Sequence, residues 1–132
     1  MKLLAYEVDK RSFLGVLNED ETWVYPVSAA GMEYRSMKDL IREAGPSEME
    51  MLDYISKKAP GDVMGAAPVD EIRVVSPIAE PDQDIICLGI NYMDHAEESA
   101  RFEKRAFEKP EKAIYFSKRV NRTNDPDGII PA

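Results

Sequence analysis

The start of the chain holds three short apolar stretches that are separated by polar residues. The stretches cover residues 2–8, 12–17 and 22–27. Leu4, Tyr6 and Val8 fall on one side of the first stretch, because side chains alternate between the two faces of a strand. The polar breaks, Asp9-Lys10 and Glu19-Asp20-Glu21, have the length of hairpin turns. The pattern predicts a three-stranded antiparallel meander.

Two stretches with helical spacing of apolar residues follow the meander. Ser36 opens the first, with Asp39 three residues later as the partner expected in a capping box. Ser47 and Glu50 repeat this start signal for a second helix, which residues 59–61 end. The apolar faces consist of Met37, Leu40, Ile41 and Ala44 in the first helix and Met51, Leu52, Ile55 and Ala59 in the second.

The rest of the chain reads as a connector, three strands and one short helix. The connector covers 60–70, strands are expected at 71–78, 85–90 and 113–117, a helix at about 92–100, a loop or frayed helix at 101–112 and a turn at 124–128. Pro77 and Pro81 bracket a boundary near residue 80. The apolar run around Cys87 predicts a buried strand with an inert thiol.

The net charge of −8 argues against a general nucleic-acid or anionic-membrane surface, since both need a positive field. No stretch reads as a signal peptide and no apolar run approaches the roughly 20 residues that cross a bilayer, so we expect a cytoplasmic protein. Residues 101–122 depart from the acidic average, with 8 basic against 3 acidic side chains. This excess is either an ordinary solvated face or a site for a small carboxylate substrate.

The segment that follows the strand at 85–90 is the most informative for chemistry. It contains His95, the only histidine of the chain, and Glu98 three residues later. On a helix these two side chains share a face, so the carboxylate can accept a proton from one imidazole nitrogen and leave the other nitrogen as a base. The same spacing also fits a solvent-facing pair on an amphipathic helix.

Other constellations carry weaker signals. The sequence has no cluster of Cys or His with metal-ligand spacing. Asp125-Pro126-Asp127-Gly128 matches a fragment of a calcium loop but lacks the remaining ligands, so it predicts a plain turn. Ser99 follows His95 by four residues without the strand-turn-helix elbow of a nucleophilic serine.

Three pieces of the chain, in order, resemble the fumarylacetoacetate hydrolase family. Residues 1–8, 14–17 and 24–26 are similar to the small N-terminal domain of many bacterial members. Pro77-Ile78 leads to 85–98, where Gly89-Ile90-Asn91-Tyr92-Met93-Asp94-His95-Ala96-Glu97-Glu98 resembles the family's strand followed by G-x-N-Y-x-x-H-x-x-E. Residues 113–119 resemble the strand that ends in a substrate-contacting lysine.

The resemblance implies an enzyme that acts on β-diketo acids, 2-oxo acids or their enols by C–C bond hydrolysis, decarboxylation or isomerisation. His95 and Glu98 match the family's catalytic dyad, and Lys118, Arg119 and Asn91 are implied substrate-binding residues. A magnesium or manganese ion is implied in the complete enzyme, where it stabilises an enolate. For Lys118 the alternative is an ordinary solvated lysine.

The sequence departs from the family pattern at the metal site. The family's Glu-x-Glu pair and later Asp have no counterpart here, because Glu48-Met49-Glu50 falls in the first turn of a predicted helix. We therefore expect no metal site in this chain alone, which is a fragment, one half of a split enzyme or a truncated relic. It is expected to form a homo-oligomer or to associate with the missing catalytic part. The competing interpretation is a non-catalytic α+β interaction module.

The expected fold class is α+β. Residues 1–78 are expected to form a small domain, with an antiparallel sheet and two helices. Residues 79–132 are expected to hold the first strands and the short helix of a β-rich catalytic domain of the fumarylacetoacetate hydrolase type, which is incomplete here.

Overall fold

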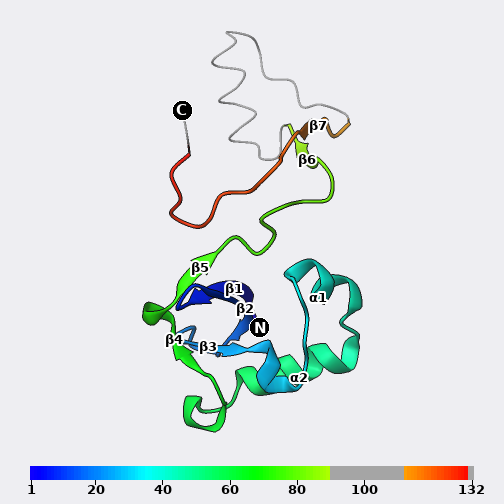
Figure 1. Ribbon diagram of the computed structural model, residues 1–132. Coiled ribbons are helices and arrows are strands. Elements are labelled where there is room, and N and C mark those ends of the chain that lie inside the picture. Colours follow the sequence, from blue (N-terminus) through cyan, green and yellow to red (C-terminus); the bar gives the residue numbers. More distant parts are fainter. Residues whose placement is uncertain (90–111, 131–132) are drawn as a thin grey trace. The chain divides into compact units, whose positions relative to one another are not determined.

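The computed structural model describes residues 1–89 and 112–130 of the chain (Figure 1). The chain forms two compact units. The first comprises Met1–Ala79 together with Thr123–Ala132, and the second comprises Glu80–Arg122. The fold is α+β, and its described part contains a five-stranded and a two-stranded antiparallel sheet and two α-helices.

The first unit is built on a sheet that begins with the predicted meander. Its three strands are β1 (Leu3–Val8), β2 (Arg11–Leu17) and β3 (Trp23–Pro26). Two short strands, β4 (Ala67–Pro68) and β5 (Arg73–Val75), complete the sheet in the order β4-β3-β2-β1-β5. The strand expected at 71–78 is shorter than predicted, because a 3₁₀ turn, η3 (Val69–Glu71), precedes it.

The turn between β1 and β2 fixes the register in which these two strands pair. Val8 pairs with Arg11, so Asp9 and Lys10 form a two-residue connection. Both have positive φ, 49° and 63°. Positive φ at both central residues is the geometry of a type I′ turn, whose twist matches that of the flanking strands.

The sheet is curled so that its two edge strands approach one another. Leu4, Tyr6 and Val24 form a buried cluster on the inner face. Ala67 of β4 and Val74 of β5 both pack against this cluster, although they belong to opposite edges of the sheet. The inner face therefore has its own small core.

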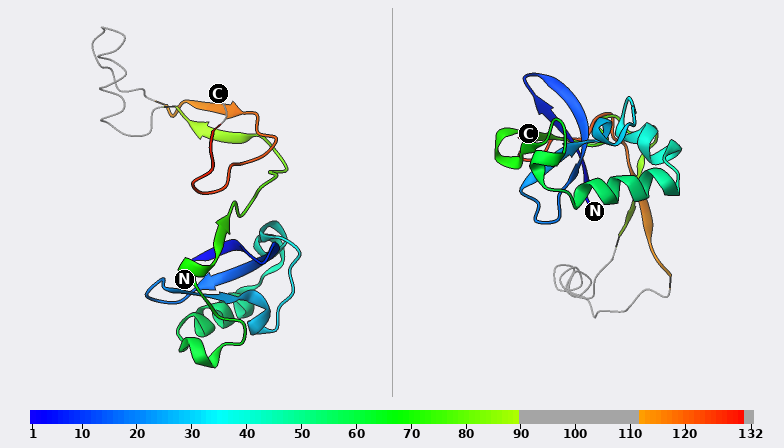
Figure 2. Two further views of the ribbon diagram at one scale, coloured as in Figure 1. Left: turned by 60° about the vertical axis from the view of Figure 1, so that its left-hand side comes forward. Right: turned by 90° about the horizontal axis from the view of Figure 1, so that it is seen from below.

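The helices cover the opposite face of the sheet (Figure 2). They are η1 (Val27–Ala30), α1 (Met37–Glu43), α2 (Pro46–Ser56) and η2 (Pro60–Asp62). Leu40 of α1 and Leu52 and Ile55 of α2 are buried against Val16 and Tyr25 of the sheet. Within the described ranges, no helix has both the length and the apolar character needed to cross a membrane.

The start of α1 is confirmed and the start of α2 is corrected. Ser36 caps α1, and its side chain accepts a hydrogen bond from the Asp39 backbone N–H. The cap of α2 is Gly45, two residues before the expected Ser47, and the helix begins at Pro46. The Glu48 carboxylate accepts the Gly45 N–H at 2.6 Å, so glutamate replaces Ser47 as the capping side chain. Proline suits this position because the first helical N–H groups lack partners in any case.

The predicted apolar faces of the helices are right in part. Met37, Leu40, Leu52 and Ile55 are buried, whereas Ile41 and Met51 are exposed. Helix α2 ends at Ser56, before the predicted end at 59–61, because Ala59 precedes a proline and is extended.

Residues 123–130 return to the end of β5 and pack against it within the first unit. The Thr123 hydroxyl donates to the Ile78 carbonyl at 2.7 Å, and the Thr123 N–H donates to the Ala79 carbonyl at 2.8 Å. The predicted turn is present, since the Gly128 N–H donates to the Asp125 carbonyl at 3.0 Å.

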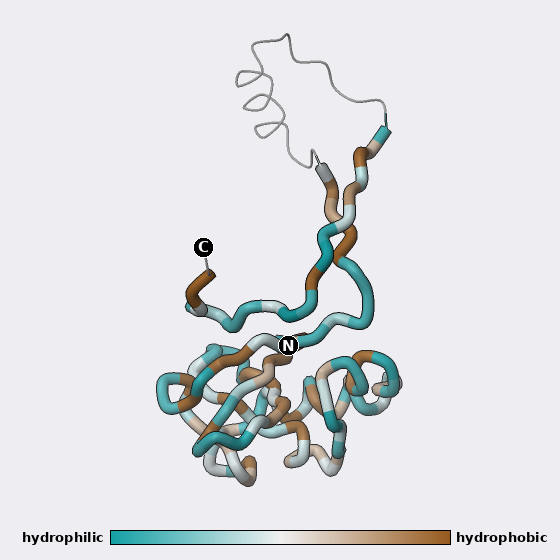
Figure 3. Tube along the Cα trace, turned by 45° about the horizontal axis from the view of Figure 1, so that its top comes forward, coloured by the Kyte–Doolittle hydropathy of each residue, from teal (hydrophilic) through white to brown (hydrophobic). Residues whose placement is uncertain are grey.

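The second unit holds one hairpin in its described part, made of β6 (Ile85–Leu88) and β7 (Tyr115–Lys118). Hydrophobic residues occur in both strands (Figure 3). The predicted burial is wrong: Ile86 is 74% exposed and Leu88 is 42% exposed. Cys87 is half-buried. Apolar composition predicted a strand with cover on both faces, but burial depends on the layers that pack against it.

Candidate functional site

The predicted dyad, His95 and Glu98, lies outside the described residues. The same is true of Asn91, an implied substrate-binding residue. The described chain leads to them through β6, after which the Gly89 N–H donates to the Ile114 carbonyl at 2.8 Å. That bond fixes the hairpin end from which residues 90–111 depart.

Lys118 is the last residue of β7, and its side chain is exposed. Its ammonium nitrogen lies 5.7 Å from the centroid of the Phe116 ring, within the range of a cation–π contact. Arg119 follows the strand directly and is also exposed. Both implied substrate-binding cations are therefore accessible to solvent.

The register of the hairpin places Lys118 on a defined face and at a defined end. Lys118 pairs with Ile85, and Phe116 pairs with Cys87. Because directly paired residues of antiparallel strands point to the same face, these four side chains share one face. Lys118 stands three pairs away from the Leu88 end, which corresponds to about 10 Å along the strand.

Glu48 and Asp125 belong to the two segments whose residues partly match metal-binding motifs, and both carboxylates bind partners within the protein. Glu48 lies in the first turn of α2 and binds the Gly45 N–H, as expected of a helix start. Asp125 accepts the Ser76 N–H at 2.9 Å and the Arg73 guanidinium at 2.6 Å. Among residues 1–89 and 112–130, no group of three or more His, Cys, Asp or Glu side chains is arranged to hold a metal ion.

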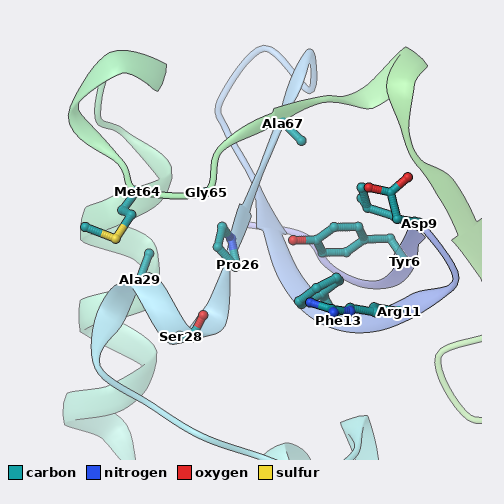
Figure 4. Close-up of a pocket in the computed structure, with 11 residues that line it drawn as sticks. Tyr6, Asp9, Arg11, Phe13, Pro26, Ser28, Ala29, Met64, Gly65 and Ala67 are labelled. Carbon is teal, nitrogen blue, oxygen red and sulfur yellow. The ribbon is translucent and has the colours of Figure 1, made fainter.

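The sequence did not reveal a concave site on the first unit. This pocket, of about 630 Å³, lies on the inner side of the curled sheet (Figure 4). It is lined by residues that include Tyr6, Phe13, Pro26, Ala29 and Met64. The alternation of β1 marked Tyr6 as a core residue, and no local pattern indicates that an opening would form above it.

Comparison of the chain with protein-family models finds no match, and comparison with curated proteins finds none either.

Proposed function

We propose that this chain is the N-terminal portion of a metal-dependent enzyme of the fumarylacetoacetate hydrolase type. Its substrate would be a β-diketo acid or a 2-oxo acid, and its reaction C–C bond hydrolysis, decarboxylation or enol–keto isomerisation. The observation that carries the proposal is the segment 89–98, whose glycine, asparagine, tyrosine, histidine and final glutamate stand at the family's spacing directly after β6.

The chemistry of the proposed site follows from the two dyad residues. His95 acts as the general base and takes a proton from water or from a carbon next to the substrate carbonyl. Glu98 accepts the other imidazole N–H, orients the ring and stabilises the imidazolium that forms. A neutral imidazole is required, so turnover falls at acidic pH as His95 becomes protonated.

Two described cations support an anionic substrate. Lys118 and Arg119 are consecutive, exposed and situated at the end of β7. A substrate carboxylate that reaches this end of the hairpin gains a charge-assisted hydrogen bond. The proposal requires His95 and Lys118 to contact the same substrate. Lys118 lies three residue pairs from Leu88, the last residue of β6, after which the chain continues toward His95.

The proposed enzyme needs a divalent cation, magnesium or manganese, which supplies Lewis-acid stabilisation of an enolate. The donors present among the described residues do not form a fitting set, since Glu48 and Asp125 are occupied by backbone N–H groups. The ligands would come from a Glu-x-Glu segment outside this sequence.

The experiment is steady-state kinetics of the chain expressed together with the coding region that supplies a Glu-x-Glu segment. Parent, His95→Ala, Glu98→Gln and Lys118→Ala are assayed with one acylpyruvate and one 2-oxo acid in the presence of Mg²⁺ or Mn²⁺. Loss of a positioned base lowers the rate by roughly 10²–10⁴, so His95→Ala should lose most turnover and still bind metal. Glu98→Gln should lose less, because the amide keeps a hydrogen bond but not the charge.

Lys118→Ala should mainly raise KM for the anionic substrates. Lys112→Ala is its matched control, since Lys112 is an exposed lysine just before β7. Wild-type turnover by His95→Ala on every substrate that the parent accepts would show that His95 and Glu98 are an ordinary surface pair. Absence of turnover in the completed parent would favour the non-catalytic interaction module.

A further inference from the structure

The pocket on the inner side of the sheet contains a tyrosine hydroxyl group that has no hydrogen-bond partner among the described residues. Tyr6 is only 2% exposed, and its ring stacks on Phe13 with centroids 5.6 Å apart. No hydrogen bond to its hydroxyl is formed by any residue in the described ranges. Every fully buried side-chain oxygen or nitrogen there has a partner, so the small exposed part of Tyr6 must include this oxygen.

The position of the ring directs the hydroxyl into the pocket. Gly15 lies beneath the Tyr6 ring, and a Cβ at Gly15 would stand 2.8 Å from Tyr6 Cε1. The missing side chain lets the ring lie flat over β2. Figure 4 shows the hydroxyl pointing toward Pro26 and away from Asp9.

The walls of the pocket are apolar and remain open to solvent. Met64 is 89% exposed and Phe13 is 38% exposed, and both line the pocket with Pro26 and Ala29. A volume of about 630 Å³ lies within the range of small-molecule sites. Apolar walls around one directed polar group are typical of sites that bind small organic molecules.

The charges at the pocket do not favour an ion of either sign. The two charged lining residues are Asp9, which lies in the first hairpin turn, and Arg11, which directly follows that turn. One is an anion and the other a cation, so their fields oppose each other. Burial raises the pKa of Tyr6, so its hydroxyl keeps its proton and is available as a donor.

We propose that this pocket binds a small uncharged compound with an aromatic ring and a carbonyl oxygen, and that the Tyr6 hydroxyl donates a hydrogen bond to that oxygen. The ring of the ligand would pack against Phe13, Pro26 and Met64. The residues that line this pocket all belong to the first unit, whereas Lys118 and Arg119 of the proposed keto-acid site belong to the second.

The test is an NMR titration of the full chain with three probes. Acetophenone has the ring and the acceptor, toluene has the ring alone, and benzoate has the ring with a negative charge. Acetophenone should shift the amide signals of Ala29, Gly65 and Ala67 and should bind more tightly than toluene and benzoate. Tyr6→Phe should weaken acetophenone about three- to tenfold, as expected for one hydrogen bond, and leave toluene unchanged.

Two further variants make the result decisive. Tyr25→Phe is the matched control, since Tyr25 is buried on the other face and donates to the Lys58 carbonyl at 2.8 Å. It should leave acetophenone binding unchanged. Met64→Ser removes an exposed wall residue and should weaken acetophenone and toluene alike. Acetophenone binding that is absent, that is unaffected by Tyr6→Phe, or that is weaker than benzoate binding would overturn the proposal.

Discussion

The backbone N–H of Ser76 donates to Oδ1 of Asp125 at 2.9 Å, although the two residues are 49 positions apart. Oδ2 of the same carboxylate accepts the Arg73 guanidinium at 2.6 Å. Asp125 thereby joins Arg73, the first residue of β5, to Ser76, which directly follows the strand. The returning segment 123–130 is in this way attached to the first unit rather than to the hairpin that precedes it.

Asp125→Ala should lower the stability of the first unit by about 1–3 kcal/mol, because the N–H of the buried Ser76 loses a charged acceptor. The measurement is the denaturant midpoint, with hydrogen exchange at the Ser76 amide as a local readout. Asp70→Ala is the control, since Asp70 is exposed and no other described residue forms a bond to its carboxylate. Equal midpoints for the two variants would contradict a stabilising role for Asp125.

Gly15→Ala should destabilise the curled sheet by about 1–3 kcal/mol through overpacking. The added Cβ would meet Val24 Cγ2 at 2.5 Å and the Tyr25 carbonyl oxygen at 3.1 Å. Gly61→Ala is the matched control, because a Cβ added at Gly61 would have no atom within 4 Å. This substitution should leave the stability nearly unchanged. Thermal unfolding of both variants tests this, and a Gly15→Ala protein as stable as Gly61→Ala would exclude the close packing.

Glu48→Ala should destabilise the chain by about 0.5–2 kcal/mol, in the range of other capping side chains, because it removes the acceptor of the Gly45 N–H. Ser47→Ala, one residue earlier and exposed, should have little effect. Urea unfolding of the two variants separates the observed helix start from the one that the sequence suggested. A larger loss for Ser47→Ala would restore the serine as the cap.

Stability should fall at alkaline pH because of two buried tyrosines. Burial raises the pKa of Tyr6 and of Tyr25 above the ordinary value of 10.0. The unfolded chain releases these protons first, so the folded state binds more protons and loses stability as pH rises from about 10 through the folded pKa. Tyr6→Phe and Tyr25→Phe should each reduce this slope in unfolding experiments between about pH 9 and pH 12. An unchanged slope in both variants would refute the assignment.

The exposed hairpin should promote association of the chain. Ile86 and Tyr115 are exposed apolar residues on β6 and β7, and open strand edges recruit other chains. Sedimentation at high concentration should show a homo-oligomer, which Ile86→Lys should shift toward monomer. Met64→Lys, at an exposed residue of the first unit, is the control. A parent chain that remains monomeric would contradict this prediction.

The sequence by itself determined the local elements of the first unit. Alternation in 2–8 and the polar pair Asp9-Lys10 were enough to predict the first hairpin, because both signals act between near neighbours. Ser36 and Asp39 likewise marked the start of α1. For α2 two competing start signals lay two residues apart, and Pro46 with the Glu48 carboxylate formed the start in place of Ser47.

Only the tertiary structure decided which residues are covered and which meet. The exposure of Ile86 depends on what packs against the hairpin, and the bond between Ser76 and Asp125 depends on the return of a distant segment. The pocket at Tyr6 depends on the curl of the sheet over Gly15. His95 and Glu98 were selected by their spacing together with the resemblance to the family, and their roles remain a prediction. Spacing along the chain encodes local geometry, whereas packing is set by contacts between residues that the sequence keeps far apart.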